Sequence, residues 1–201
     1  MRVYKDTEPW AIDNQRSFVK DALHIAGEKV LVRQRWHLDD YLAGEVERCK
    51  KCHAGQSESV QERIAKAYGG QAGETFCDDC YSIGYKGGFK PEVYIVHAEI
   101  VYSAETWERD ETGEEFTQQL RATFSYVPLL RQGDLIVRAF EWNGDKIEKE
   151  EGRFITGEVE YQKLRTGPRQ KNDGLKDMVV GQTTQLTTVP TEHVFQKVEI
   201  E

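Results

Sequence analysis

The chain from residue 93 to residue 102 reads Val93-Tyr-Ile-Val-His-Ala-Glu-Ile-Val-Tyr102. β-Branched and aromatic residues fill most of this stretch, which is typical of a β-strand. Hydrophobicity keeps a period of two from residue 92 onward, so one side of each later segment can face a core while the other faces water. This pattern predicts a mainly β fold for the C-terminal half of the chain.

Turn signals divide the rest of this half into further strands. Asp110-Glu-Thr-Gly113 is expected to be the turn between strands 93–102 and 116–126, which should form the longest hairpin. Asn143-Gly144 marks a second hairpin turn. The other expected strands are 135–142, 152–161, 179–189 and 193–200. Six or so antiparallel strands at short spacing predict a small antiparallel β-barrel or sandwich.

The segment 1–46 is expected to supply one helix and the first strand of the same β-domain. Asn14 or Ser17 can cap the helix, and Gly27 ends it. The apolar stripe of this helix consists of Phe18, Ala22, Leu23 and Ile25. Residues 29–36 then alternate between apolar and polar side chains, with Leu31 as the exception, and are interpreted as a strand.

Four cysteines form two CxxC pairs, Cys49-Lys-Lys-Cys52 and Cys77-Asp-Asp-Cys80. Two such pairs can aim four thiolates at one point and close a tetrahedral site that suits zinc. Disulfides and redox pairs are the alternatives. We expect no signal peptide, which argues against disulfides, and no βαβ context surrounds the pairs, which argues against a redox role. The sequence therefore predicts a structural Zn²⁺ ion held by Cys49, Cys52, Cys77 and Cys80.

The two CxxC pairs lie in a segment that we interpret as a zinc-ribbon-like insertion, residues 47–91. Residues 57–68 form a helix candidate between the pairs, which Gly69-Gly70 ends. The β-domain then resumes as residues 92–201. The fold expected for the whole chain is thus mainly β, with a four-cysteine insertion and one or two short helices.

Composition narrows the function. The chain has 201 residues and a net charge of −8, and it contains no block of basic residues. Tight binding to nucleic acid is therefore disfavoured, because such binding depends on cations that neutralise phosphates. No apolar run approaches the length of a membrane span, so no membrane association is expected.

Residue patterns that carry catalysis are missing as well. The chain has no phosphate-binding glycine loop, HExxH or GxSxG pattern. His53 follows Cys52 directly, but four cysteines already complete a site. His97 and His193 have no nucleophile pattern beside them, so they are interpreted as packing or surface residues. Acidic clusters at predicted turns are interpreted as solvated turns. The protein is not expected to be an enzyme.

A polar stretch, residues 166–177, contains Leu175 as its single apolar anchor. Such a segment cannot bury enough apolar surface to hold one conformation by itself. We expect it to be an interaction loop that becomes ordered on assembly. The residues expected to make its contacts are Arg169, Gln170, Lys171, Asn172 and Asp173.

The order of these elements resembles neck proteins of tailed bacteriophages, of the head closure or head-to-tail stopper kind. The phrases that carry the resemblance are Gly133-Asp134-Leu135 and Gly152-Arg153-Phe154, which in that family introduce strands of a small barrel. The family's long loop would correspond to residues 166–177. The basic strand 30–36 and the cysteine segment that ends at Pro91 precede the barrel. The smallest members of the family have no zinc insertion.

The resemblance implies a structural role in the virion neck, with no catalytic residues. The expected partners are copies of the chain in a six- or twelve-fold ring, a portal or adaptor protein above it, and a tail protein below it. Packaged double-stranded DNA would pass through the channel without specific binding. The chain would be made in the cytoplasm of the bacterial host. The alternative is a zinc-ribbon binding module in nucleic-acid metabolism, which predicts a basic patch near the cysteines.

Overall fold

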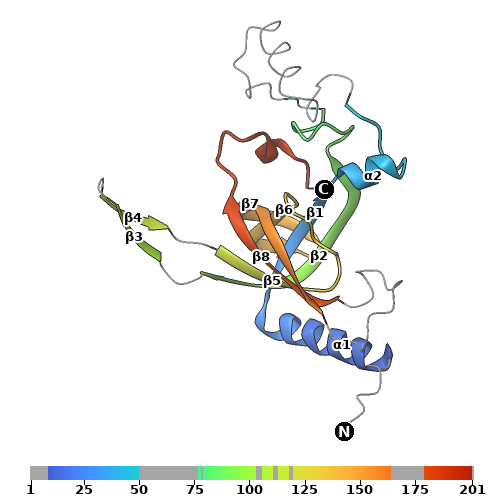
Figure 1. The fold of residues 1–201 in the computed structure, drawn as a ribbon, viewed down its shortest axis with the longest axis vertical. Coiled ribbons are helices and arrows are strands. Elements are labelled where there is room, and N and C mark those ends of the chain that lie inside the picture. Colours follow the sequence, from blue (N-terminus) through green and yellow to red (C-terminus); the bar gives the residue numbers. More distant parts are fainter. Residues whose placement is uncertain are drawn as a thin grey trace, which may run out of the picture.

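The structure, a computed structural model, describes residues 9–49, 77, 79–102, 106–110, 113–117, 120–163 and 179–200. A closed β-barrel forms its centre, with one long helix beneath it in the view of Figure 1. The mainly β fold predicted from the sequence is confirmed, and the choice between a barrel and a sandwich is settled in favour of the barrel.

Six antiparallel strands make up the barrel, in the order β1-β2-β5-β8-β7-β6. Their bounds are β1 Glu28–Arg35, β2 Phe89–Tyr102, β5 Leu120–Ser125, β6 Leu135–Asn143, β7 Lys146–Lys163 and β8 Val179–Thr188. The turn predicted at Asn143-Gly144 joins β6 to β7, where Asn143 pairs with Lys146. Gly144 has a φ of +61°, the left-handed conformation that this kind of tight hairpin requires.

Strand β1 closes the barrel. Its residue Val30 pairs with Val96 of β2 on one side and with Arg138 of β6 on the other. The N-terminal strand therefore lies between two strands that both follow the cysteine segment. Closure removes both sheet edges, which would otherwise present unpaired backbone groups.

The hairpin predicted for strands 93–102 and 116–126 is wrong in its connection. Strand β2 does pair with β5, from Ala98 opposite Phe124 to Tyr102 opposite Leu120. The predicted turn instead joins β3 (Thr106–Asp110) to β4 (Gly113–Thr117), which form a separate two-stranded sheet. This ribbon, β3–β4, extends away from the barrel (Figure 1). Alternation of apolar and polar residues predicts that a segment is a strand, but it does not predict which strand pairs with it.

Two apolar clusters lie on opposite faces of the barrel wall. Inside the barrel, the largest fully buried side chains are those of Phe124, Leu130 and Ile136. The outer cluster covers Leu31, Leu135 and Val137 with residues from the C-terminal segment, which are Val189, Val194, Phe195 and Val198. Strand β1 thus contributes Val30 and Val32 to the interior and Leu31 to the outer cluster, which explains its break in alternation.

The strand predicted for residues 193–200 is wrong. The chain there forms the 3₁₀-helix η1, Val194–Lys197, and His193 caps it by accepting a hydrogen bond from the backbone N–H of Phe195. Arg153 holds this segment in place: its guanidinium donates to the carbonyl oxygens of Phe195 and Val198, each at 2.8 Å. Arg153 thereby helps to hold the segment as a cover over the outer apolar cluster.

Helix α1 (Pro9–Ala26) lies on the outside of the barrel, against β2, β5 and β8. The stripe predicted for its buried face is largely wrong: Leu23 is buried, while Phe18 and Ile25 are 68% and 85% exposed. The buried side of the helix includes Arg16, whose Nε donates to the carbonyl oxygen of Val179 at 3.0 Å. The face of α1 that meets the barrel thus carries Arg16 as well as Leu23.

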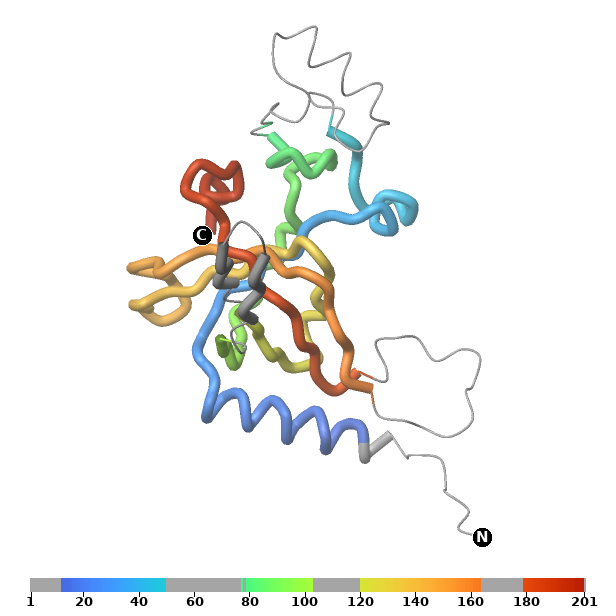
Figure 2. The backbone as a smooth tube through the Cα atoms, turned by 60° about the vertical axis from the view of Figure 1, so that its left-hand side comes forward, coloured from blue at the N-terminus to red at the C-terminus, as the bar shows by residue number. Residues whose placement is uncertain are grey.

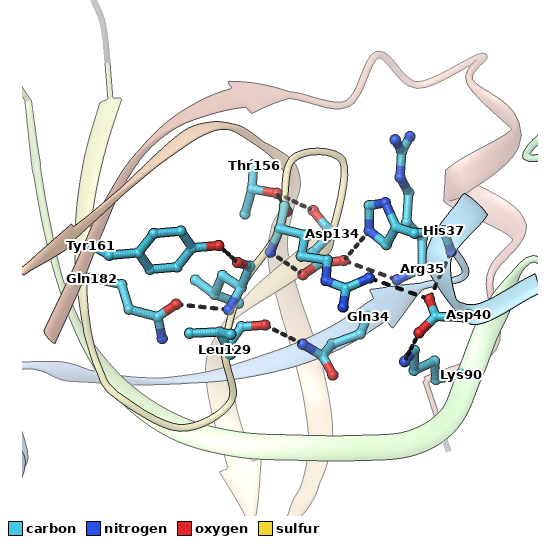
Figure 3. A network of polar contacts seen from close by, with 12 residues as sticks. Gln34, Arg35, His37, Asp40, Lys90, Leu129, Asp134, Thr156, Tyr161 and Gln182 are labelled. Carbon is cyan, nitrogen blue, oxygen red and sulfur yellow. Dashed lines mark hydrogen bonds and ion pairs between the residues drawn. The ribbon is translucent and has the colours of Figure 1, made fainter. Parts of the chain in front are cut away.

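The loop of residues 126–134, which joins β5 to β6, closes the barrel where β1 ends. Polar side chains from other strands form hydrogen bonds with the backbone groups of this loop (Figure 3). Gln182 is fully buried; its amide donates to the carbonyl oxygens of Ser125 and Pro128, and its carbonyl oxygen accepts from the N–H of Leu130. Tyr161 donates to the carbonyl oxygen of Leu130 at 2.7 Å. Leu130 can therefore enter the apolar interior without unpaired backbone groups.

The phrase Gly133-Asp134-Leu135 forms the end of this loop. Gly133 has a φ of +88°, and a Cβ atom there would lie 2.5 Å from the guanidinium carbon of Arg35. Asp134 is fully buried, and its carboxylate accepts hydrogen bonds from the backbone N–H groups of Arg35 and Arg131. The glycine and the aspartate thus connect the loop to the end of β1.

Replacing Gln182 with methionine should destabilise the barrel. The change removes one hydrogen bond from a backbone N–H and two to backbone carbonyl oxygens, and each buried group left unpaired costs about 1–3 kcal/mol. We expect the free energy of unfolding to fall by at least about 3 kcal/mol, measured by urea denaturation. Gln185→Met on the exposed side of the same strand is the matched control. Equal losses in the two variants would contradict this role for Gln182.

Acidification should loosen α1 from β2. His24 and His97 meet with their Nδ1 atoms 3.4 Å apart. Burial lowers the pKa of His97, and the charges of His24 and Lys29 lower it further. As pH falls, His97 therefore binds a proton in the unfolded chain before it does so in the folded chain. The contribution of neutral His97 to folding stability is fully present above about pH 6.5, and it is lost as pH falls through the folded-state pKa. Unfolding curves from about pH 7.5 to pH 5.5 should show this loss, and His97→Gln should reduce it; an unchanged slope would refute the assignment.

Candidate metal centre

The described residues between β1 and β2 lie at one end of the barrel, with α1 at the opposite end in both Figure 1 and Figure 2. They include the short helix α2, Leu38–Leu42. The two strands stay paired down to Arg35 and Phe89. Beyond that pair, the N–H of Trp36 donates to the carbonyl oxygen of Gly88 at 3.0 Å. The two ends of the long connection between β1 and β2 are thereby held next to each other.

Three of the predicted ligands come together in this connection. The sulfur atoms of Cys49, Cys77 and Cys80 all lie within 4.8 Å of one another. All three side chains are buried, and Cys80 is fully so. Together they form an apolar cluster separate from the two clusters of the barrel.

The spacing of the sulfurs fits a metal better than a disulfide. The sulfurs of Cys49 and Cys77 are 3.8 Å apart, whereas a disulfide requires about 2.05 Å. Thiolates about 2.3 Å from a tetrahedral metal would be about 3.8 Å apart. Three buried thiolates without a cation between them would repel one another. This cluster therefore has the composition and spacing of a metal site.

The backbone around Cys80 folds tightly to make this cluster. The two residues after it, Tyr81 and Ser82, have φ values of 50° and 61°. Ser82 turns back so that its hydroxyl accepts a hydrogen bond from the N–H of Cys77 at 3.2 Å. Gly88 packs against this turn, and a Cβ atom there would lie 2.6 Å from the carbonyl oxygen of Cys80. A side chain at residue 88 would push the turn away from β2.

The first CxxC pair is joined to this turn through the backbone. The N–H of Cys49 donates to the carbonyl oxygen of Gly84 at 2.9 Å, and Arg48 forms a β-bridge with Tyr85. These contacts bring two segments that are distant in sequence to the same point. Cys52, the fourth predicted ligand, lies outside the described residues, as do the helix candidate 57–68 and the loop 166–177 with all five of its predicted contact residues.

The basic residues near the cysteines are largely paired with acids in the part of the chain that the structure describes. Lys86 lies 3.9 Å from Glu47, and Lys90 lies 2.8 Å from Asp40. Each of these two lysines thus has an acidic neighbour, which reduces the local positive charge. Lys50 and Lys51 lie outside the described residues.

Asp40 was not predicted from the sequence, although it connects several segments near the cysteine cluster. Its carboxylate accepts from Lys90, from the backbone N–H of His37, and from Arg131 at 3.5 Å (Figure 3). Burial raises the pKa of Asp40, but the hydrogen bonds from Lys90 and His37 lower it more, so the pKa lies below its usual value. An aspartate three residues after a helix cap is a sequence signal for this position.

Comparison with known proteins gives no assignment. No protein-family model matches the chain, and no curated protein is significantly similar to it. Neither helix in the described ranges combines the length and apolar character needed to cross a membrane.

Cys80→Ser should abolish metal binding while the barrel stays folded, because the cysteine cluster is separate from both barrel clusters. Elemental analysis of the purified wild-type chain should find one bound metal ion, and the variant should hold none. The strand signal in circular dichroism should remain. Lys86→Gln, an exposed change in the same segment, is the control and should keep its metal. A fully folded wild-type chain without metal would refute this site.

Proposed function

We propose that this protein is a structural component of the neck of a tailed bacteriophage, of the head closure or head-to-tail stopper kind. It would act by assembling into a six- or twelve-fold ring between a portal or adaptor protein and a tail protein. The two phrases that carry the sequence resemblance support this reading, because both have defined roles in the barrel. Asp134 connects its loop to β1, and Arg153 holds the C-terminal cover.

The observation that carries the proposal is the isolated ribbon β3–β4. It pairs with no other described strand, and it extends away from the barrel (Figure 1). A two-stranded sheet of five-residue strands is marginally stable by itself in water. A partner surface would stabilise it, and in a ring the neighbouring copy provides such a surface. Contacts of this kind are heterologous, since the ribbon of one copy meets a different face of the next.

In this proposal the metal is a structural zinc ion, with Cys52 completing the set that Cys49, Cys77 and Cys80 begin. Four thiolates would leave no open position for water or substrate. Zinc would therefore stabilise the connection between β1 and β2 and would supply no chemistry. The metal cross-links a segment that is too small to fold around a core of its own.

The charge of the chain suits a channel for DNA. A net charge of −8 gives the phosphates of passing double-stranded DNA no general attraction to the ring. The protein would then reside in the virion neck after synthesis in the bacterial cytoplasm. The nucleic-acid alternative predicts the opposite behaviour, namely salt-dependent binding of DNA to the isolated chain.

The proposal is tested in the phage that encodes the chain. Peptides of the protein should be recovered from purified particles by mass spectrometry, and antibodies against the barrel should label the neck in electron micrographs. Absence of the protein from purified particles, or DNA binding by the isolated chain, would overturn the assignment.

A variant in which a short Gly-Ser linker replaces the ribbon, residues 104–118, tests how assembly occurs. We expect filled or leaking heads without tails, because the ring would lose contacts between copies. Circular dichroism of the purified variant should show that the barrel is intact. The control inserts the same linker at the turn Gly144-Asp145, which lies at the tip of another hairpin. Infectious particles with the ribbon removed would show that the ribbon makes no required contact.

A further inference from the structure

A pocket of about 310 Å³ opens beside the barrel, independent of the cysteine cluster. Its walls come from α1, the end of β1, the start of β2 and the loop 126–134. Segments from four parts of the chain therefore meet at one concavity. Its volume lies at the lower end of the range found for binding sites of small organic molecules.

Basic side chains dominate the polar part of this pocket. They are Arg16, Arg35, Lys90 and Arg131, one from each of the four segments. Asp134 is the one acidic residue among the described residues that line it, and its two oxygens already accept backbone hydrogen bonds. Asp40 lies behind Lys90 and Arg131 and pairs with both. Arg16 also lies 3.8 Å from Asp13, which is exposed. Four cations against these three carboxylates leave an excess of one positive charge, in a chain with a net charge of −8.

Two buried donors at the pocket have no hydrogen-bond partner in the described part of the chain. They are Nε of Arg35 and Nε2 of His37. Nε2 of His37 is 3.8 Å from Asp134, which is beyond hydrogen-bonding distance (Figure 3). Buried polar groups are nearly always satisfied in native proteins, so the acceptor for these two donors comes from solvent or from a ligand that enters the pocket. A guanidinium group only donates hydrogen bonds, and oxyanions are its strongest partners.

The other part of the lining is apolar and aromatic. Tyr94 and Tyr126 contribute rings, and Val127-Pro128 contributes an aliphatic surface. The guanidinium of Arg16 lies 4.3 Å from the centre of the Tyr126 ring, which places a cation at the boundary between the two parts. Val127 is 47% exposed and marks the rim. A ligand that fits both parts has a charged head and a small apolar body.

We propose that this pocket binds an oxyanion, a phosphate or a carboxylate group, carried on a small aromatic or aliphatic body. The cations from α1, β1, β2 and the loop surround the charged head, and forked guanidinium groups suit both kinds of oxyanion. The tyrosines and Pro128 pack against the body. The proposal does not depend on the neck assignment, because it rests only on groups of one folded chain.

The test is isothermal titration calorimetry of the full-length chain with three probes. Phenyl phosphate and benzoate carry the two candidate head groups on the same ring, and benzyl alcohol carries none. Binding of either anion, with no heat from the alcohol, is the expected result. The tighter anion identifies the head group. Failure of both anions to bind, or equal binding of the alcohol, would overturn the proposal.

Two variants locate the binding at this pocket. Val127→Glu adds a negative charge at the exposed rim and should weaken anion binding by about tenfold or more, whereas Val127→Gln has the same shape without the charge and should bind as the wild type does. Arg35→Gln removes one cation and should also weaken binding. Arg121→Gln, a change at an exposed arginine outside the pocket, should have no effect. Equal affinities for the Val127→Glu and Val127→Gln variants would place the anion elsewhere and refute the site.

Discussion

The pairing of β1 with both β2 and β6 is the constraint on which the rest of this structure depends. Strand β1, from the N-terminal region, forms hydrogen-bonded ladders with β2 on one side and with β6 on the other. Because closed barrels have no free edge, strand order and register must agree all the way round. Helix α1, which precedes β1, is thereby placed on the outer wall, and the connection that follows β1 must leave and return at the same end of the barrel.

Buried polar side chains hold the irregular parts of the chain against this barrel. Gln182 and Asp134 satisfy the backbone of the loop 126–134, and Arg153 does the same for the C-terminal segment. Each of these residues makes two or more hydrogen bonds to backbone groups. Fully satisfied networks of this kind make a core specific, whereas partly satisfied ones are costly. Nε of Arg35 and Nε2 of His37 have no hydrogen-bond partner among the residues that the structure describes, and both side chains line the pocket.

The cysteine cluster and the pocket both adjoin the segment around α2, and the pocket extends from there to α1. Lys90 leads from the cysteine turn into β2, and its ion pair with Asp40 joins the two sites. The barrel thus carries a two-stranded ribbon, a segment with three clustered cysteines and a basic pocket.

Much of the fold was predictable from local patterns. Period-two hydrophobicity located the five barrel strands that follow the cysteine segment, and the Asn143-Gly144 turn lies where its chemistry predicted. Cysteine spacing predicted that the cysteines would cluster, and the structure describes three members of that cluster. These features depend on a few neighbouring residues, and side-chain chemistry at short range decides them.

The tertiary structure alone decided the remaining features. Alternation identifies the faces of a strand but not its partner, so the barrel closure and the separate ribbon β3–β4 could not be read from the pattern. The buried side of α1 depends on Arg16 reaching Val179, and the C-terminal 3₁₀-helix depends on Arg153, contacts between residues far apart in sequence. The pocket is decided in the same way. Its four cations are scattered along the chain and become a site only where the closed barrel brings them together.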